Sequence, residues 1–176
     1  MAVILNEKLF YPPYSEIKEY GQDNLIYGSL TQNGITSLVT YIEKHIPGYI
    51  YGMDLGCGDG ELVYHLQTQL TNSIWEGVEI SEHRISMKVR DVYIWQGDML
   101  LENYKPYTIL HADNLCLTPL ILDKLEEKIS IEFSGLYITY VYPKNINLLR
   151  KIIFLDKIQL EATWGIHSVY LFKINA

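Results

Sequence analysis

A stretch of nine residues, Met53–Glu61, constrains the fold of this 176-residue chain more than any other. It places three alternating glycines, Gly56, Gly58 and Gly60, between an apolar segment over residues 49–54 and a helical pattern over residues 60–70. Glycine adopts positive φ angles and lets the backbone approach a ligand closely. The sequence therefore predicts a buried strand, a ligand-binding turn and a helix in succession.

Strands and helices alternate on either side of this turn. The apolar spacing predicts a helix over residues 31–46, capped by Thr31. Further helices are predicted over residues 81–89 and from Thr118-Pro119 onward, and further strands over 74–80, 91–95, 107–112, 135–142, 157–164 and 167–174. The last two strands would form a hairpin through Trp164-Gly165-Ile166, whereas the first 30 residues appear irregular in pattern.

Alternating strands and helices with short connections form a parallel sheet that is covered on both faces. We therefore predict a single α/β domain over residues 1–176, with a Rossmann-like, mostly parallel seven-stranded sheet, helices on both faces and a C-terminal β-hairpin. A chain of this length forms one domain of ordinary size.

Composition excludes several classes of protein. The chain carries 14 basic and 21 acidic side chains, a net charge of −7, so direct binding of nucleic acid is not expected. No apolar run approaches the ~18 residues of a membrane span, and residues 1–8 do not resemble a signal peptide. Two cysteines, Cys57 and Cys116, are too few for a disulfide scaffold or a four-ligand zinc site. We expect a soluble, intracellular protein with no metal.

Acidic residues around the glycines indicate the kind of ligand. Glu79 ends the strand after the glycine turn, 25 residues beyond Asp54, where a carboxylate can accept the hydroxyls of a ribose. The spacing G-x-G-x-G, without a following G-K-[ST], excludes a phosphate-binding Walker loop. Asp54 and Asp59 would repel a pyrophosphate but suit an ammonium group and a sulfonium centre. These charges favour S-adenosyl-L-methionine over a dinucleotide.

The same residues resemble those of a known family. Asp54-Leu55-Gly56-Cys57-Gly58-Asp59-Gly60 resembles motif I of the class I methyltransferases, and Gly97-Asp98-Met99 resembles their next motif, in which an aspartate binds the adenine amino group. The resemblance covers about residues 49–142. It implies a methyltransferase core over residues 48–176, a segment over residues 1–47 that covers cofactor and substrate, and S-adenosyl-L-methionine as cofactor. The implied cofactor-binding residues are Tyr27, Asp54, Gly56, Gly58, Gly60, Glu61, Glu79, Asp98, Met99 and Asn114.

A narrower resemblance concerns the acceptor of the methyl group. Leu25-Ile26-Tyr27-Gly28, Asp113-Asn114-Leu115, Thr163-Trp164 and Val169-Tyr170 are similar, in order, to motifs of the non-SET histone lysine methyltransferases, the disruptor-of-telomeric-silencing family. The resemblance implies Tyr27, Asn114 and Tyr170 as catalytic residues, a basic protein substrate such as a histone, and a nuclear location if that substrate is a histone. Ser29 and Asp113 depart from the family pattern, and no basic tail is present.

Two other functions fit the general motifs equally well. One is a class I methyltransferase that acts on a small molecule or an RNA, and the other is a cofactor-binding subunit without activity of its own. Individual residues also admit purely structural interpretations. Tyr170 and His111 would then be core residues, Trp164 a packing residue and Asn114 a helix cap. The sequence leaves the oligomeric state open.

Overall fold

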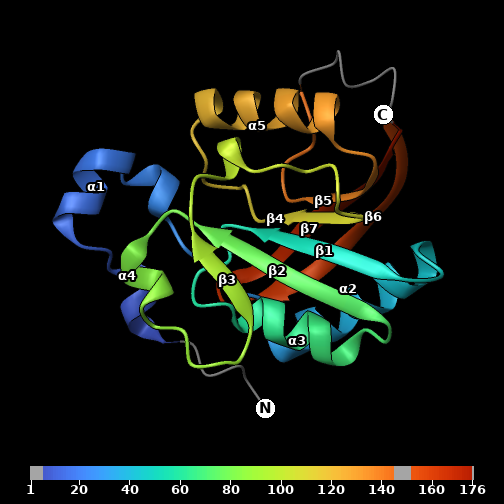
Figure 1. Cartoon of the computed structure of the whole chain (residues 1–176), viewed down its shortest axis with the longest axis horizontal. Helices are drawn as coiled ribbons and strands as arrows, with labels where there is room; N and C mark the ends of the chain where they lie inside the picture. Colours follow the sequence, from blue (N-terminus) through green and yellow to red (C-terminus); the bar gives the residue numbers. More distant parts are fainter. Residues whose placement is uncertain (1–5, 145–151, 176) are drawn as a thin grey trace.

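The computed structural model describes residues 6–144 and 152–175, which form one seven-stranded sheet between two layers of helices (Figure 1). The strands are β1 (Ile50–Leu55), β2 (Ser73–Glu79), β3 (Tyr93–Gln96), β4 (Ile109–Ala112), β5 (Gly135–Thr139), β6 (Ile152–Ala162) and β7 (Gly165–Ile174). Their order in the sheet is β3-β2-β1-β4-β5-β7-β6. Strands β1 to β5 are parallel, and β7 is antiparallel to both β5 and β6. The predicted mostly parallel sheet with a C-terminal hairpin is confirmed.

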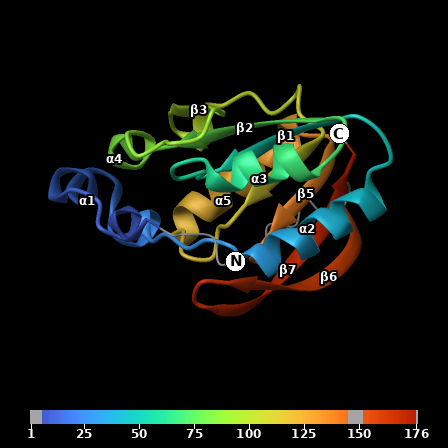
Figure 2. The same ribbon diagram turned by 90° about the horizontal axis from the view of Figure 1, so that it is seen from below.

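Helices cover both faces of the sheet, as predicted. The α-helices are α1 (Tyr14–Tyr20), α2 (Gln32–His45), α3 (Glu61–Gln69), α4 (Glu82–Ile85) and α5 (Pro119–Glu132), and three short 3-10 helices are η1 (Glu7–Phe10), η2 (Asp23–Leu25) and η3 (Met99–Leu101). Helices α2 and α3 lie against one face and α5 lies against the other, while α1 and α4 lie together at one end of the molecule (Figures 1 and 2). That end is where the parallel strands terminate.

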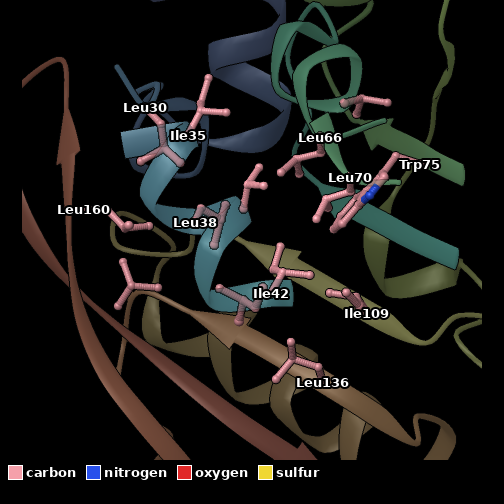
Figure 3. Packing of buried hydrophobic residues seen from close by; sticks show 14 of the residues in the cluster. Leu30, Ile35, Leu38, Ile42, Leu66, Leu70, Trp75, Ile109, Leu136 and Leu160 are labelled. Carbon is pink, nitrogen blue, oxygen red and sulfur yellow. The ribbon is translucent and has the colours of Figure 1, made fainter. Parts of the chain in front are cut away.

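A hydrophobic cluster fixes the strands that carry the site. Ile35, Leu38 and Ile42 form the apolar stripe of α2 and are essentially inaccessible to solvent, and Figure 3 shows them facing the sheet beside α3. Thr31 caps α2 as predicted, because its hydroxyl accepts a hydrogen bond from the Gly34 N–H at 3.2 Å. Each fully buried aliphatic side chain contributes about 1.5–3 kcal/mol. Helix α2, which precedes the predicted boundary at residue 47, is part of this cluster. Residues 6–30 form the N-terminal segment before α2, and its last residue, Leu30, also joins the cluster.

That N-terminal segment is more regular than predicted. It contains η1, α1 and η2, although α1 buries none of its residues and therefore shows no apolar periodicity. A single carboxylate fastens α1 to α4. Glu16 accepts hydrogen bonds from the Ser81 hydroxyl at 2.6 Å and from the His83 N–H at 3.1 Å. This polar docking leaves no signature that a pattern of hydrophobic residues could reveal.

Several helices and strands begin or end at other residues than predicted. Helix α4 has four residues where nine were predicted, and β5 ends at Thr139 instead of residue 142. The strand stops early because the Asn114 side chain takes the N–H groups of Tyr140 and Val141. The hairpin strands β6 and β7 begin earlier than predicted and turn at Thr163-Trp164, with Ala162 paired to Gly165.

None of the helices in the described parts of the chain is long and apolar enough to cross a membrane. Residues 1–5, which carry most of the prediction about a signal peptide, lie outside the described residues.

Candidate functional site

The glycine turn adopts the conformation for which its glycines are suited. Gly56, Gly58 and Gly60 have φ angles of +80°, +59° and +85°, a region that other residues rarely adopt. The turn leaves β1 and enters α3 at the edge where the neighbouring parallel strands β2 and β4 also end. In open α/β sheets, ligands bind beyond these carboxyl ends of the strands.

Two adjoining hollows lie at this edge. The larger encloses about 640 Å³, partly open to solvent, and its walls include Tyr27, Gly56, Glu79, Arg84, Met99, Asp113, Asn114 and Trp164. The smaller spans about 330 Å³, also partly open to solvent, and its walls include Tyr27, Gly56, Asp54, His111, Asp113 and Tyr140. Because both share Tyr27, Gly28, Gly56 and Asp113, they form two compartments of one site.

Glu79 connects the end of β2 to the glycine turn. Its side chain is 3% exposed, and its two carboxylate oxygens accept hydrogen bonds from the Gly58 N–H at 2.9 Å and the Ser81 N–H at 3.0 Å. Burial raises the pKa of Glu79 above its ordinary value, while the nearby Arg84 guanidinium, 3.7 Å away, opposes that rise. Each oxygen still has a lone pair with which to accept a ligand hydroxyl.

Arg84 is a buried cation that the sequence pattern did not predict. It is 3% exposed and donates hydrogen bonds to the carbonyl oxygens of Leu9 (3.0 Å) and Leu25. Its guanidinium group also lies 5.0 Å from the ring centroid of Tyr27. Arg84 thereby ties the N-terminal segment to the wall of the larger hollow. A charged residue in a short polar helix carries no periodic signal of burial.

Tyr27 lies directly on the glycine turn. A β-carbon on Gly58 would come within 2.4 Å of the Tyr27 ring, so the ring packs against the bare backbone. The edge of this ring meets Phe10, and desolvation raises the pKa of Tyr27 well above its ordinary value. Tyr27, which the sequence predicts to bind the cofactor, thus lines both hollows.

The next residue, Gly28, is covered by an aromatic side chain from the other end of the chain. A β-carbon on Gly28 would lie 2.5 Å from the Trp164 ring. The segment is held there by backbone hydrogen bonds, from Thr163 N–H to Ser29 O at 2.9 Å and from Thr31 N–H to Glu161 O at 3.0 Å. Trp164 therefore both packs on the backbone of Gly28 and lines the larger hollow.

Asn114 is fully engaged by the protein. Its amide nitrogen donates to the Thr139 and Tyr137 hydroxyls at 2.9 and 3.3 Å. Its carbonyl oxygen accepts from the N–H groups of Tyr140 and Val141 at 3.0 and 3.2 Å. Asn114 lies in the wall of the larger hollow, but its polar atoms connect the β4 loop to the end of β5. The predicted catalytic position thus holds a structural cross-link between strands.

Some predicted site residues lie outside the walls of both hollows. Tyr170 is on β7, where it pairs with Thr139 at the end of β5, and the centroid of its ring lies 5.4 Å from that of Tyr142. Glu61 pairs with Arg90 at 2.9 Å on the surface of α3. Asp98 caps η3 by accepting the Leu100 N–H at 2.9 Å, and only its neighbour Met99 reaches the larger hollow.

Gly60 likewise faces inward, because a β-carbon there would meet Val92 and Ile94 at 3.0–3.1 Å. Among the described residues, no group of three or more histidine, cysteine, aspartate or glutamate side chains is arranged to hold a metal ion.

This sheet order, glycine turn and C-terminal hairpin constitute the Rossmann-like class I methyltransferase fold, which solved structures share with this chain. Magnesium protoporphyrin IX methyltransferase from Synechocystis PCC 6803, with bound S-adenosyl-L-methionine, has a TM-score of 0.61 at 13% identity and covers 80% of this chain and 78% of its own. A TehB-like S-adenosyl-L-methionine-dependent methyltransferase from Corynebacterium glutamicum has a TM-score of 0.57 at 13% identity, with 92% and 94% covered.

A third similar structure is an amino pentose methyltransferase from Micromonospora echinaspora with bound S-adenosyl-L-methionine, with a TM-score of 0.51 at 13% identity and 81% and 76% covered. No protein-family model and no curated protein sequence matches the chain. At these identities the similarity establishes the fold, and the residues of the site carry the argument about function.

Proposed function

We propose that this protein is an S-adenosyl-L-methionine-dependent methyltransferase that acts on a small molecule. One observation carries the proposal: two buried carboxylates, Asp54 and Glu79, flank a glycine turn with positive φ angles at the carboxyl edge of the sheet. A ligand with ribose hydroxyls at one end and an ammonium group at the other fits this donor and acceptor set, whereas a pyrophosphate would face two negative charges.

Different residues would bind the adenosine end and the amino acid end of such a cofactor. Glu79 would accept hydrogen bonds from the ribose hydroxyls, and Met99 would pack against the adenine ring in the larger hollow. Asp54 would accept the ammonium group of the amino acid end in the smaller hollow. When bound, the cofactor would supply a sulfonium methyl group, to which a nucleophilic atom of the acceptor bonds as the carbon–sulfur bond breaks and the thioether leaves. The protein supplies mainly position and orientation, which dominate the rate of such a step.

Two observations favour a small-molecule acceptor: the position of Tyr170, and the acceptors of the methyltransferases with similar structures. The lysine interpretation expects Tyr170 to line a channel, whereas Tyr170 is not among the wall residues of either hollow and its ring packs against Tyr142. Asp23, Asn24 and residues 26–28 form part of the wall of the larger hollow, so the N-terminal segment narrows the space for an acceptor. Two of the similar structures are described as methyltransferases of magnesium protoporphyrin IX and of an amino pentose.

Protein-lysine methylation is the second candidate, and one observation favours it. Tyr27 and Gly28 pack on Gly58 and beneath Trp164, so two aromatic rings lie near the shared wall of the hollows. Aromatic rings can hold a charged lysine by cation–π contact before it loses its proton. The resemblance of this segment to the non-SET lysine methyltransferases supports that function.

Cofactor binding is the first test. Calorimetric titration with S-adenosyl-L-homocysteine should show saturable binding, and Glu79→Ala should weaken it at least about 10-fold because two ribose hydrogen bonds are lost. Glu82→Ala, an exposed carboxylate three residues further along the chain, is the matched control and should bind like the wild type. Absence of binding to the wild-type protein would contradict the proposal.

The acceptor is tested with methyl-labelled cofactor and three separate pools: metabolites, histones and RNA. Label in the metabolite pool supports the small-molecule acceptor, and label on histone lysines supports the second candidate. Cofactor binding without label in any pool would indicate a cofactor-binding subunit that has no activity of its own.

A further inference from the structure

A chain of three buried polar side chains crosses the floor of the smaller hollow. Asp54 of β1 and His111 of β4 are direct neighbours in the parallel register, and Tyr140 follows the end of β5. His111 Nδ1 lies 2.7 Å from Asp54 Oδ1, and His111 Nε2 lies 3.0 Å from the Tyr140 hydroxyl. All three residues are at most 4% exposed, and all three line the smaller hollow.

The chemistry of the partners assigns the direction of the hydrogen bond to Asp54. A carboxylate oxygen accepts, so Nδ1 of His111 carries a proton and donates to Asp54. The Tyr140 hydroxyl, which can donate as well as accept, engages Nε2 on the opposite side of the ring. Burial raises the pKa of Tyr140 well above its ordinary value, which keeps this hydroxyl protonated and able to donate. The Nδ1–H of His111 therefore points at Asp54, while Tyr140 holds the opposite nitrogen of the ring.

This direction matters because Asp54 is a carboxylate with little access to water. Its side chain is 5% exposed, and within the described residues His111 is the one hydrogen-bond partner of that side chain. A hydrogen bond to the charged form of a buried acid stabilises that form and fixes the orientation of the group. His111 occupies Oδ1, which leaves Oδ2 as the oxygen that a ligand can engage.

Packing reinforces the same geometry. The rings of His111 and Tyr140 meet edge to face at 85°, with centroids 5.4 Å apart, so the imidazole cannot rotate without displacing Tyr140. A second carboxylate, Asp113, lies in the wall of the same hollow. The smaller hollow thus combines two carboxyl groups with the hydrogen-bonded His111 and Tyr140, a composition that suits a cationic group of a ligand.

We propose that His111 is a positioning residue, which together with Tyr140 orients the Asp54 carboxylate to bind the ammonium group at the amino acid end of the cofactor. The role rests on the proposed cofactor and deepens it. Loss of the hydrogen bond from His111 to Asp54 would weaken binding of the amino acid end of the cofactor. Binding of the adenosine end, in the larger hollow, would stay unchanged. A histidine that served only to pack the core would affect both ends alike.

Two ligands separate these alternatives. S-adenosyl-L-homocysteine carries the ammonium group, and 5′-methylthioadenosine has the same adenosine end without it. In calorimetric titrations of the full chain, His111→Phe should lose roughly 10- to 100-fold in affinity for the first ligand and less than about 3-fold for the second. His111→Asn, whose amide can still donate near the position of Nδ1, should recover part of the loss. Tyr140→Phe, which removes one hydroxyl, should show a smaller loss of the same kind.

Tyr107→Phe is the matched control. It also removes the hydroxyl of a buried tyrosine, one that donates to the Glu76 carboxylate at 2.7 Å, but Tyr107 lies outside both hollows. It should bind both ligands like the wild type. If His111→Phe does not fold, as judged by near-ultraviolet circular dichroism, Tyr140→Phe and His111→Asn carry the test.

Equal losses for both ligands, or no loss for either, would overturn the positioning role while leaving the proposed function intact. Failure of the wild-type protein to bind either ligand would instead overturn the proposed function, and the role of His111 with it.

Discussion

The ring of Tyr27 lies on the bare backbone of Gly58, so that a β-carbon at residue 58 would come within 2.4 Å of Tyr27 Cε2. The glycine turn therefore does two things in this protein. It supplies the positive φ angles that lead from β1 into α3, and it accommodates a side chain from the N-terminal segment. The contact joins the segment of residues 6–30 to the centre of the site.

Gly58→Ala should consequently destabilise the protein by more than backbone strain alone. A non-glycine residue in the left-handed region costs about 1–2 kcal/mol, and displacement of the Tyr27 ring adds to it. Urea unfolding should show a loss of about 2–4 kcal/mol. Gly48→Ala is the control, because its φ angle of +132° is also unfavourable for alanine but no atom lies within 4 Å of the added carbon.

The double variant Tyr27→Ala/Gly58→Ala separates strain from collision. Removing the ring should make the Gly58→Ala substitution less costly than it is in the wild-type background, because only the backbone strain remains. Additive effects of the two substitutions would show that the ring and the glycine turn do not interact in solution.

Arg84 should be the most sensitive charged residue for the attachment of the N-terminal segment. Arg84→Met removes one partner of a buried ion pair with Glu79 and two hydrogen bonds to the backbone of residues 9 and 25. Breaking a buried pair on one side costs about 3–5 kcal/mol. We expect faster hydrogen exchange and easier proteolysis within residues 6–30, measured by mass spectrometry.

Arg90→Met is the appropriate comparison for Arg84→Met. Arg90 pairs with Glu61 at 2.9 Å but its side chain is 42% exposed, so solvent screens the pair and its loss should have little effect. If both variants release the N-terminal segment equally, the buried position of Arg84 has no special role.

The two parts of the molecule were not equally predictable from the sequence. The sheet, the helix over residues 32–45 and the glycine turn follow from apolar periodicity and from glycine spacing, which are local signals. Arg84 and Glu16 carry no such signal, because the hydrogen bonds by which they join the N-terminal segment to α4 link residues 59 or more positions apart. The contacts that hold the N-terminal segment against α4 could therefore not be predicted from the sequence.

For His111 and Tyr170, the sequence likewise does not show which way the side chain faces. Both lie in apolar strands, and the sequence cannot tell which face of a strand buried on both sides turns toward a ligand. The register places His111 beside Asp54 and in the smaller hollow, whereas Tyr170 points to an aromatic contact with Tyr142. Strand register, rather than residue type, separates these two candidates.

Stability should depend on pH through Glu79. Because burial raises its folded-state pKa, the folded protein retains the proton over a range in which the unfolded chain has lost it. The contribution of Glu79 to stability is therefore fully present below the unfolded pKa of about 4.3 and is lost as the pH rises through the folded pKa. The difference in unfolding free energy between wild type and Glu79→Gln should fall as the pH increases.

Chemical denaturation of both proteins at a series of pH values checks this expectation. Glu82→Gln, which removes an exposed carboxylate from α4, should show no such trend relative to the wild type. A difference that grows with pH would mean that Arg84 and the two N–H groups outweigh burial and hold the carboxylate ionised.

Asn114 provides the last prediction, because its engaged amide distinguishes a structural role from a catalytic one. Asn114→Ala leaves the N–H groups of Tyr140 and Val141 without their acceptor, and each buried orphan costs about 1–3 kcal/mol. We expect a loss of about 2–4 kcal/mol in urea unfolding. Asn114→Asp keeps the acceptor oxygen, and the hydroxyls of Thr139 and Tyr137 can turn to donate, so it should retain more stability. Unchanged stability together with abolished methyl transfer would instead make Asn114 a catalytic residue, because its substitution would then act on the reaction and not on the fold.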